Sequence, residues 1–254
     1  MKSLLLKEAA SFLVPFRCDI CGGYSDIEKG ISYLESLYRS VYLCDRGFHI
    51  CSRCLHGIVP QTADKRWFTC LSNPIDGDDY NTLTLFMPFS YSGIVDKALP
   101  RIKFDGNMEI ARLFGLLLGE IIRTEGITAD LVVPVPLSEQ RFRERGFNQA
   151  YEIAYPVSSI CCIPMGEDVL KRTRNTGRQS DISNTTMRAV NISGAFDLNR
   201  NWDIEGLRIL LVDDVATTGN TLRECAVKLY ENGASDVLCC AFSGNRQIKN
   251  DEPF

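Results

Sequence analysis

Blocks of apolar and polar residues near the C-terminus predict a strand, a helix and a second strand. The apolar run 209–212 predicts a buried strand, and 236–241 predicts another. Between them, 222–232 repeats apolar side chains at helical spacing and ends before Gly233, a common helix stop. A strand, a crossover helix and a strand indicate a parallel sheet, whose ligands bind beyond the carboxyl ends of the strands.

Two further segments extend this α/β pattern toward the N-terminus. Apolar positions in 107–123 predict a helix that packs on the sheet, and 131–135 predicts a second buried strand. The segment 61–81 is polar and rich in turn-forming residues, which indicates a linker. We therefore expect a boundary near Tyr80, with a small module in 1–80 and an α/β domain in 81–254.

The segment between the first strand and the helix carries candidate ligand chemistry. Asp213 and Asp214 end the strand, and we expect both side chains to face solvent. The loop that follows combines the N–H groups of a helix start with hydroxyls and a glycine, which suits a phosphate. Its residues are Val215, Ala216, Thr217, Thr218, Gly219, Asn220 and Thr221. Carboxylates accept hydrogen bonds from sugar hydroxyls or bind Mg²⁺, so the string predicts a sugar-phosphate site. The alternative is a solvated acidic pair before an ordinary helix.

Basic residues gather in two places against an acidic background. The net charge is -4 and the pI about 5.4. Arg141, Arg143 and Arg145 follow the strand 131–135, and a second group lies in a segment without periodicity that we expect to be a loop. That second group is Lys171, Arg172, Arg174 and Arg178. Guanidinium groups present planar sets of donors that match phosphate, so a focused polyanion site is predicted. The alternative for any one of these residues is a solvated surface position.

The eleven cysteines indicate metal binding in a reducing compartment. Lys7-Glu8 interrupts the N-terminal apolar run, and no apolar stretch approaches the roughly 18 residues of a membrane span. We therefore expect a cytoplasmic protein without membrane insertion. Cys18, Cys21, Cys51 and Cys54 form two CxxC pairs that suit tetrahedral Zn²⁺ in a structural role. Cys44 or His49 could replace one ligand, and buried free thiols without metal are a further alternative.

Several motifs, in this order, resemble the ComF family of phosphoribosyltransferase-like proteins linked to competence and DNA uptake. They are Tyr91-Ser92-Gly93, Ile102-Lys103-Phe104-Asp105-Gly106-Asn107, Val133-Pro134-Val135-Pro136-Leu137, the run Arg141-Phe142-Arg143-Glu144-Arg145-Gly146-Phe147-Asn148-Gln149-Ala150, Lys171-Arg172-Thr173-Arg174, and Gly194-Ala195-Phe196. With the loop 211–221, the resemblance covers about 89–241. It implies a type I phosphoribosyltransferase fold, a parallel sheet flanked by helices, with an N-terminal zinc module.

The resemblance also implies ligands and roles. Phosphoribosyl pyrophosphate (PRPP) with Mg²⁺ would bind, with Asp213 and Asp214 as catalytic residues and the loop 215–221 on the 5-phosphate. Pyrophosphate would contact a third set of residues: Val135, Pro136, Arg141, Arg145, Lys171, Arg172 and Arg174.

The expected reaction is transfer of the phosphoribosyl group to an unknown acceptor. Purine-salvage relatives carry an acidic residue at the position of Thr217, and a hydroxyl is a poor substitute as a base at neutral pH. This departure argues against purine salvage. The alternative function is a non-catalytic adaptor that binds single-stranded DNA or a helicase-like partner. The acidic overall charge and the lack of aromatic residues among 171–178 argue against this alternative.

Overall fold

The computed structural model describes residues 17–24, 49–61, 68–71, 83–173 and 194–244. The backbone divides into two compact units, one made of 1–59 with 92–110 and the other of 60–91 with 111–254. The segment 92–110 thus groups with the cysteine-bearing part of the chain. The domain boundary expected near Tyr80 stays a prediction.

The smaller unit contains two short cysteine segments and two helices. Helix α3 (Ser52–His56) is capped by Cys51, whose side chain accepts a hydrogen bond from the backbone N–H of Cys54. Helix α4 (Ile94–Phe104) ends at Asp105 and contains Pro100. Its apolar side is buried through Val95, Ala98, Leu99 and Ile102.

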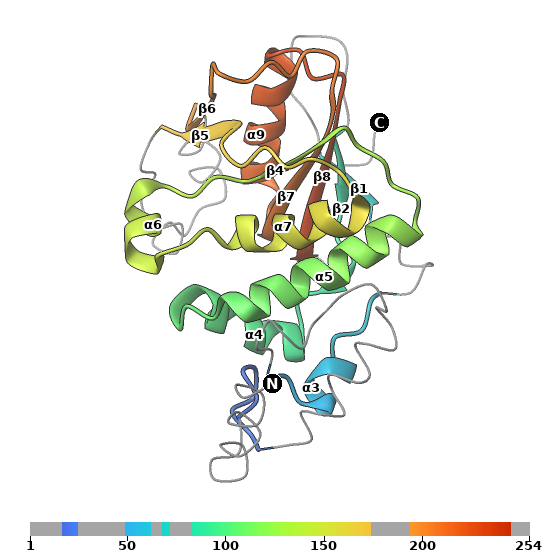
Figure 1. Cartoon of the computed structure of the whole chain (residues 1–254), viewed down its shortest axis with the longest axis vertical. Helices are drawn as coiled ribbons and strands as arrows, with labels where there is room; N and C mark the ends of the chain where they lie inside the picture. Colours follow the sequence, from blue (N-terminus) through green and yellow to red (C-terminus); the bar gives the residue numbers. More distant parts are fainter. Residues whose placement is uncertain (1–16, 25–48, 62–67, 72–82, 174–193, 245–254) are drawn as a thin grey trace, which may run out of the picture. The chain divides into compact units, whose positions relative to one another are not determined.

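The larger unit is built on a six-stranded sheet, with the strand order β1-β2-β8-β7-β4 and β3 paired to β8 (Figure 1). The strands are β1 (Phe68–Leu71), β2 (Leu83–Phe86), β3 (Phe89–Ser90), β4 (Leu131–Pro134), β7 (Arg208–Ala216) and β8 (Asp236–Gly244). Strand β7 pairs in parallel with β4 on one side and β8 on the other. The parallel sheet expected from the sequence is therefore confirmed.

Strand β1 corrects the interpretation of 61–81 as a linker. It pairs antiparallel with β2, so part of this segment belongs to the sheet edge. The segment is polar on average, and this average hid the four residues 68–71. These residues form a strand because they pair with β2. Most of the remaining expected linker lies outside the described residues.

Helices cover both faces of the sheet. Helix α9 (Asn220–Glu231) lies on one face, and α5 (Met108–Thr124) and α7 (Gln149–Cys161) lie on the other (Figure 1). The remaining elements are the short helix α6 (Glu139–Arg145) and a two-stranded sheet of β5 (Leu170–Arg172) and β6 (Phe196–Leu198). The helices expected at 107–123 and 222–232 are confirmed. Among the described helices, none combines the length and apolar character that crossing a bilayer requires.

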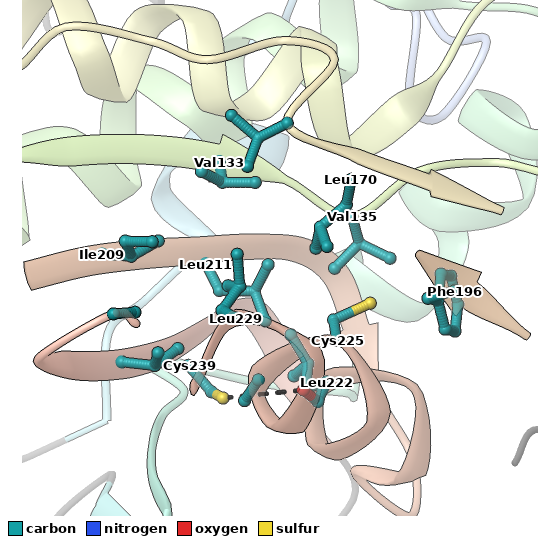
Figure 2. Close-up of a cluster of buried hydrophobic side chains, with 14 of the residues drawn as sticks. Val133, Val135, Leu170, Phe196, Ile209, Leu211, Leu222, Cys225, Leu229 and Cys239 are labelled. Atoms are coloured by element: carbon teal, nitrogen blue, oxygen red, sulfur yellow. Dashed lines mark hydrogen bonds between the residues drawn. The ribbon is translucent and has the colours of Figure 1, made fainter. Parts of the chain in front are cut away.

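The core on the α9 face joins the parallel strands to the small β5–β6 sheet. Figure 2 shows Val133 and Val135 beside Ile209 and Leu211, with α9 packed below them. From β5 and β6, Leu170 and Phe196 enter the same cluster. Burial of these apolar side chains fixes the position of the β5–β6 sheet relative to the end of β7.

On the opposite face, α5 and α7 approach each other at glycines. A Cβ atom at Gly115 would lie 2.3 Å from the backbone oxygen of Ile153, and one at Gly119 would lie 3.1 Å from Cα of Val157. The first distance is far shorter than a van der Waals contact. The atom concerned is a backbone oxygen, which cannot move aside as the end of a flexible side chain can. Phe114 stacks on Phe242 of β8 at a centroid distance of 3.8 Å, so this helix pair is also tied to the sheet.

We expect Gly115→Ala to lower the free energy of unfolding by about 1–3 kcal/mol, the usual range for overpacking. Gly119→Ala is the matched control, because its contacts are looser and about 1 kcal/mol of helix propensity gained from alanine offsets them. Urea unfolding of both variants measures their free energies of unfolding. The comparison holds if the dependence of the free energy on urea concentration is the same in both. Equal stability of the two variants would contradict close packing at Gly115.

Candidate functional site

The candidate site lies at the carboxyl edge of the sheet, where β4 and β7 end side by side. Pro134 of β4 lies opposite Val212 of β7, and the N–H of Val135 donates to the Val212 carbonyl at 2.9 Å. The segment after β4 therefore starts beside Asp213. Residues 135 and 213, far apart in sequence, meet at this edge because the strands are parallel and in register.

Strand β7 is longer than the sequence indicated. It continues to Ala216, so Val215 and Ala216 belong to the strand rather than to the loop. Thr217, Thr218 and Gly219 form the loop itself, followed by Asn220 and Thr221 in the first turn of α9, and phosphate binding by 215–221 stays a prediction. Pairing with β8, in which Val215 lies opposite Ser243, explains the extension.

The start of α9 has the features of an anion site. Gly219 adopts a left-handed conformation with φ of 72°, which only glycine adopts without strain. No side chain caps this helix start, and its first turn contains no acidic residue. The N–H groups and the positive end of the helix dipole are therefore left for an external acceptor.

The two aspartates differ in their surroundings, which corrects the expectation that both face solvent. Asp213 is partly exposed, but Asp214 retains only 8% exposure. Consecutive strand residues point to opposite faces of a sheet, so one of the pair turns inward. Asp213 Oδ1 accepts from the N–H of Asp214, and Asp214 Oδ1 accepts from the N–H of Val215, both at 2.8 Å.

Arginines from two separate elements are electrostatic neighbours of these carboxylates. Burial and the charge of Arg141 lower the pKa of Arg145, while Asp214 acts in the opposite direction. Burial and Arg141 likewise lower the pKa of Arg172, which Asp213 opposes. Arg141 on α6 is therefore an electrostatic neighbour of both other arginines, and each aspartate is a neighbour of one of them.

Local structure holds these arginines in place. Ser138 caps α6 by accepting from the N–H of Arg141 at 3.3 Å, and Gly146, with φ of 80°, ends the helix. The guanidinium carbon of Arg172 lies 5.3 Å from the centre of the Phe196 ring on β6. Such a contact between a cation and an aromatic face is favourable.

The other predicted pyrophosphate residues are less well supported by the geometry. Lys171 is exposed and lies opposite Asp197 in the β5–β6 pairing, so it faces a carboxylate-bearing neighbour. Pro136 follows β4 and is partly exposed. Arg174 and Arg178 lie outside the described residues. Arg143 is 75% exposed and pairs with Glu139, consistent with a solvated surface position.

Asn148 is a supporting residue that sequence reasoning did not assign. Its Nδ2 donates to the carbonyl of Val135 at 3.0 Å, while its Oδ1 accepts from the N–H of Ala150. The side chain thereby fastens the segment after β4 to the start of α7. An asparagine directly before a helix is a common N-cap, so the capping half of this role was detectable in the sequence.

The four cysteines Cys18, Cys21, Cys51 and Cys54 form a compact group in the smaller unit. All four sulfur atoms lie within 4.8 Å of one another, and the Cys21 and Cys51 sulfurs are 3.9 Å apart. Bonds of about 2.3 Å to a tetrahedral zinc would separate sulfurs by about 3.8 Å. The donor set and its dimensions therefore fit a tetrahedral metal.

His49 lies beside this group but is not part of it. Its N–H donates to Asp19 Oδ2 at 3.1 Å, and its carbonyl accepts from the N–H of Asp19 at 2.7 Å. These bonds join the two cysteine segments. Cys44, the other residue considered as a substitute ligand, lies outside the described residues. The arrangement favours the four-cysteine set over one that includes His49.

The family model for the phosphoribosyl transferase domain matches residues 106–252. The chain belongs to this family. The match contains every strand of the parallel sheet from β4 onward and both aspartates. The type I phosphoribosyltransferase fold expected from the sequence is therefore confirmed.

Curated relatives confirm the resemblance to the ComF family. DNA utilization protein YhgH of Escherichia coli (strain K12) is 36% identical over 152 residues, which cover 58% of this chain and 66% of that protein. Competence protein F of Haemophilus influenzae is 33% identical over 55% of this chain and 63% of that protein. Competence protein ComFC of Bacillus subtilis is 33% identical over 57% of each. The chain thus spans somewhat less than two thirds of the length of these relatives.

Solved phosphoribosyltransferase structures are also similar to part of this domain. Glutamine PRPP amidotransferase from B. subtilis, complexed with ADP and GMP, is 21% identical with a TM-score of 0.38, over 56% of this chain and 30% of that chain. Purine phosphoribosyltransferase from Pyrococcus horikoshii is 16% identical with a TM-score of 0.35, over 56% of this chain and 78% of that chain.

Proposed function

We propose that this protein binds PRPP with Mg²⁺ and transfers the phosphoribosyl group to an acceptor, in a ComF-type role in DNA uptake. One observation carries the proposal: two carboxylates, three arginines and an uncapped helix start gather at one edge of the sheet. Arg141 repels both Arg145 and Arg172. A bound polyanion would offset this repulsion among the three positive charges.

We assign the three charged parts of PRPP to three groups of residues at this edge. The start of α9, with Thr218 and Gly219, would hold the 5-phosphate through N–H groups and hydroxyls. Asp213 and Asp214 would accept hydrogen bonds from the ribose hydroxyls. Arg141, Arg145 and Arg172 would bind the pyrophosphate.

The proposed reaction is displacement at the anomeric carbon. The bond from that carbon to the pyrophosphate oxygen breaks, the acceptor forms a new bond to the same carbon, and positive charge develops on the ribose ring. The aspartates would stabilise that charge, and the arginines would neutralise the departing pyrophosphate. Asp213 and Asp214 would also be able to hold Mg²⁺, which would supply positive charge to offset that of the departing pyrophosphate.

The acceptor side of the site differs from that of a purine-salvage enzyme. Thr217 is exposed and stands where such enzymes carry an acidic base. The exposed hydroxyl of Thr217 argues against hypoxanthine and guanine as acceptors.

The proposal for the smaller unit is a structural zinc bound by Cys18, Cys21, Cys51 and Cys54. Three of these thiols are at most 2% exposed, and a closed four-thiolate site has no position for a substrate. Reduced cysteines in such a site fit a cytoplasmic protein.

A second candidate function is an adaptor for single-stranded DNA or a helicase-like partner. The names of the relatives, which refer to competence and DNA utilization, favour it. So does Phe142, which is 50% exposed between Arg141 and Arg143 on α6. An exposed ring among arginines supplies the stacking element that the basic segment 171–178 lacks.

We expect Asp213→Asn to weaken PRPP binding by about tenfold or more in the presence of Mg²⁺, equivalent to about 1.4 kcal/mol. Asp213 is the better target of the pair, because the burial of Asp214 makes its substitution a risk to folding. Isothermal titration calorimetry with PRPP measures the effect, with the exposed Asp203→Asn as control. Parent-like affinity in Asp213→Asn would exclude the ribose role.

We expect Arg141→Gln to weaken PRPP binding by about tenfold while changing ribose 5-phosphate binding less than about twofold, since PRPP alone carries the pyrophosphate. The variant should stay folded, because it removes a repulsive neighbour of two arginines. Arg143→Gln, on the same helix, is the control.

The same pair of variants tests the adaptor function. If α6 binds single-stranded DNA, Arg141→Gln should reduce the salt dependence of binding by a log-log slope of about 0.7 for the lost phosphate contact. A loss of DNA binding with unchanged PRPP affinity would favour the adaptor over the transferase.

We expect protein purified without chelators to contain about one zinc per chain, as four thiolates close one tetrahedral site. Cys54→Ser should lose the metal and loosen the smaller unit, since binding energy at such sites is largely folding energy. Elemental analysis provides the measurement, and the exposed Cys162→Ser is the control. A metal-free parent protein would contradict the zinc proposal.

A further inference from the structure

The four thiols are unequally protected from solvent. Cys18, Cys51 and Cys54 have exposures of 1%, 2% and 0%, whereas Cys21 is only partly buried. A chelator or another metal-binding molecule can therefore reach a bound metal most easily at Cys21. The rate of metal loss should depend on what surrounds this sulfur atom.

Arg53 lies at this exposed sulfur. Its Nη2 donates to Cys21 Sγ at 3.9 Å. Arg53 belongs to α3, between Cys51 and Cys54, and its carbonyl accepts from the N–H of Gly57 at 3.1 Å. The helix that carries two of the thiols therefore also positions the guanidinium over a third, which comes from the other cysteine segment.

The sulfur atoms also differ in the charge of their hydrogen-bond donors. Cys18 Sγ accepts from the backbone N–H of Cys51, and Cys51 Sγ from that of Cys54, each at 3.4 Å. Cys21 receives a guanidinium donor in addition to a backbone N–H from Gly23. A zinc ion with four thiolates carries a net charge of minus two, so one positive group at its exposed side offsets part of that charge.

We propose that Arg53 controls how fast the metal centre exchanges its metal, by holding the Cys21 thiolate on the metal and covering it from solvent. The proposal rests on the proposed zinc site and assigns Arg53 a positioning role. It predicts that charge at position 53 affects the kinetics of metal loss, while the four cysteines decide whether metal binds at all.

Zinc transfer from the full-length protein to a chromophoric chelator tests the proposal. We expect Arg53→Ala to start with the parent's zinc content and to release zinc about fivefold faster, the factor expected from an exposed ion pair near the upper end of the usual range. Arg53→Lys should restore most of the slow release, because it keeps the charge. Arg53→Gln, which keeps donors without charge, should resemble Arg53→Ala. The control is Lys97→Ala, an exposed cation on α4.

Salt dependence separates charge from simple packing. Added salt should accelerate zinc release from the parent, because screening weakens exposed ion pairs. The release rate of Arg53→Ala should change little with salt. Equal release rates for the parent, Arg53→Ala and Arg53→Gln, at equal zinc content, would overturn the role of Arg53 and leave the zinc site intact. A parent protein without zinc would overturn both.

Discussion

The parallel pairing of β7 with β4 is the constraint on which the candidate site depends. Leu131 lies opposite Ile209, and the pairing continues to Pro134 opposite Val212. Because the side-chain pattern of a strand repeats every two residues, a shift of one position would exchange the faces of Asp213 and Asp214. A shift in one direction would also bring the carboxylate of Asp213 to the position of the buried Val212. Core packing and site geometry therefore depend on the same register.

The alternation of β7 also separates the charges of the site into two groups. Asp213 shares a neighbourhood with Arg172 and with Cys225 of α9, whereas Asp214 shares one with Arg145 of α6. Arg141 contributes to both. The positive charges near the end of β7 thus come from two separate elements, helix α6 and strand β5. Only the fold brings them together.

Sequence patterns predicted the elements whose apolar periodicity is strong and failed where tertiary pairing decides. The helix at 107–123 was predicted from apolar positions at helical spacing, and the strands beside Asp213 from short continuous apolar runs. Strand β1 was missed, since a short run in a polar segment becomes a strand only through β2. The extension of β7 to Ala216 depends on its pairing with the last residues of β8, which the local pattern of β7 does not reveal. The cysteine spacing predicted a group of four thiols, and the structure confirms that they lie together. The contacts of Arg53 with Cys21 and of Asn148 with Val135 were not predicted, because each joins segments that only the fold brings together.

The cysteine group has a consequence for the unfolded chain. Cys21 and Cys51 are separated by 30 positions, and their sulfur atoms are 3.9 Å apart. A metal shared by the two pairs would join these distant positions as a disulfide does, and would reduce the conformational entropy of the unfolded chain by closing the loop between them. A disulfide persists in oxidising surroundings, whereas a metal clip opens when the metal is withdrawn. The order of the smaller unit would then follow the supply of metal in its surroundings.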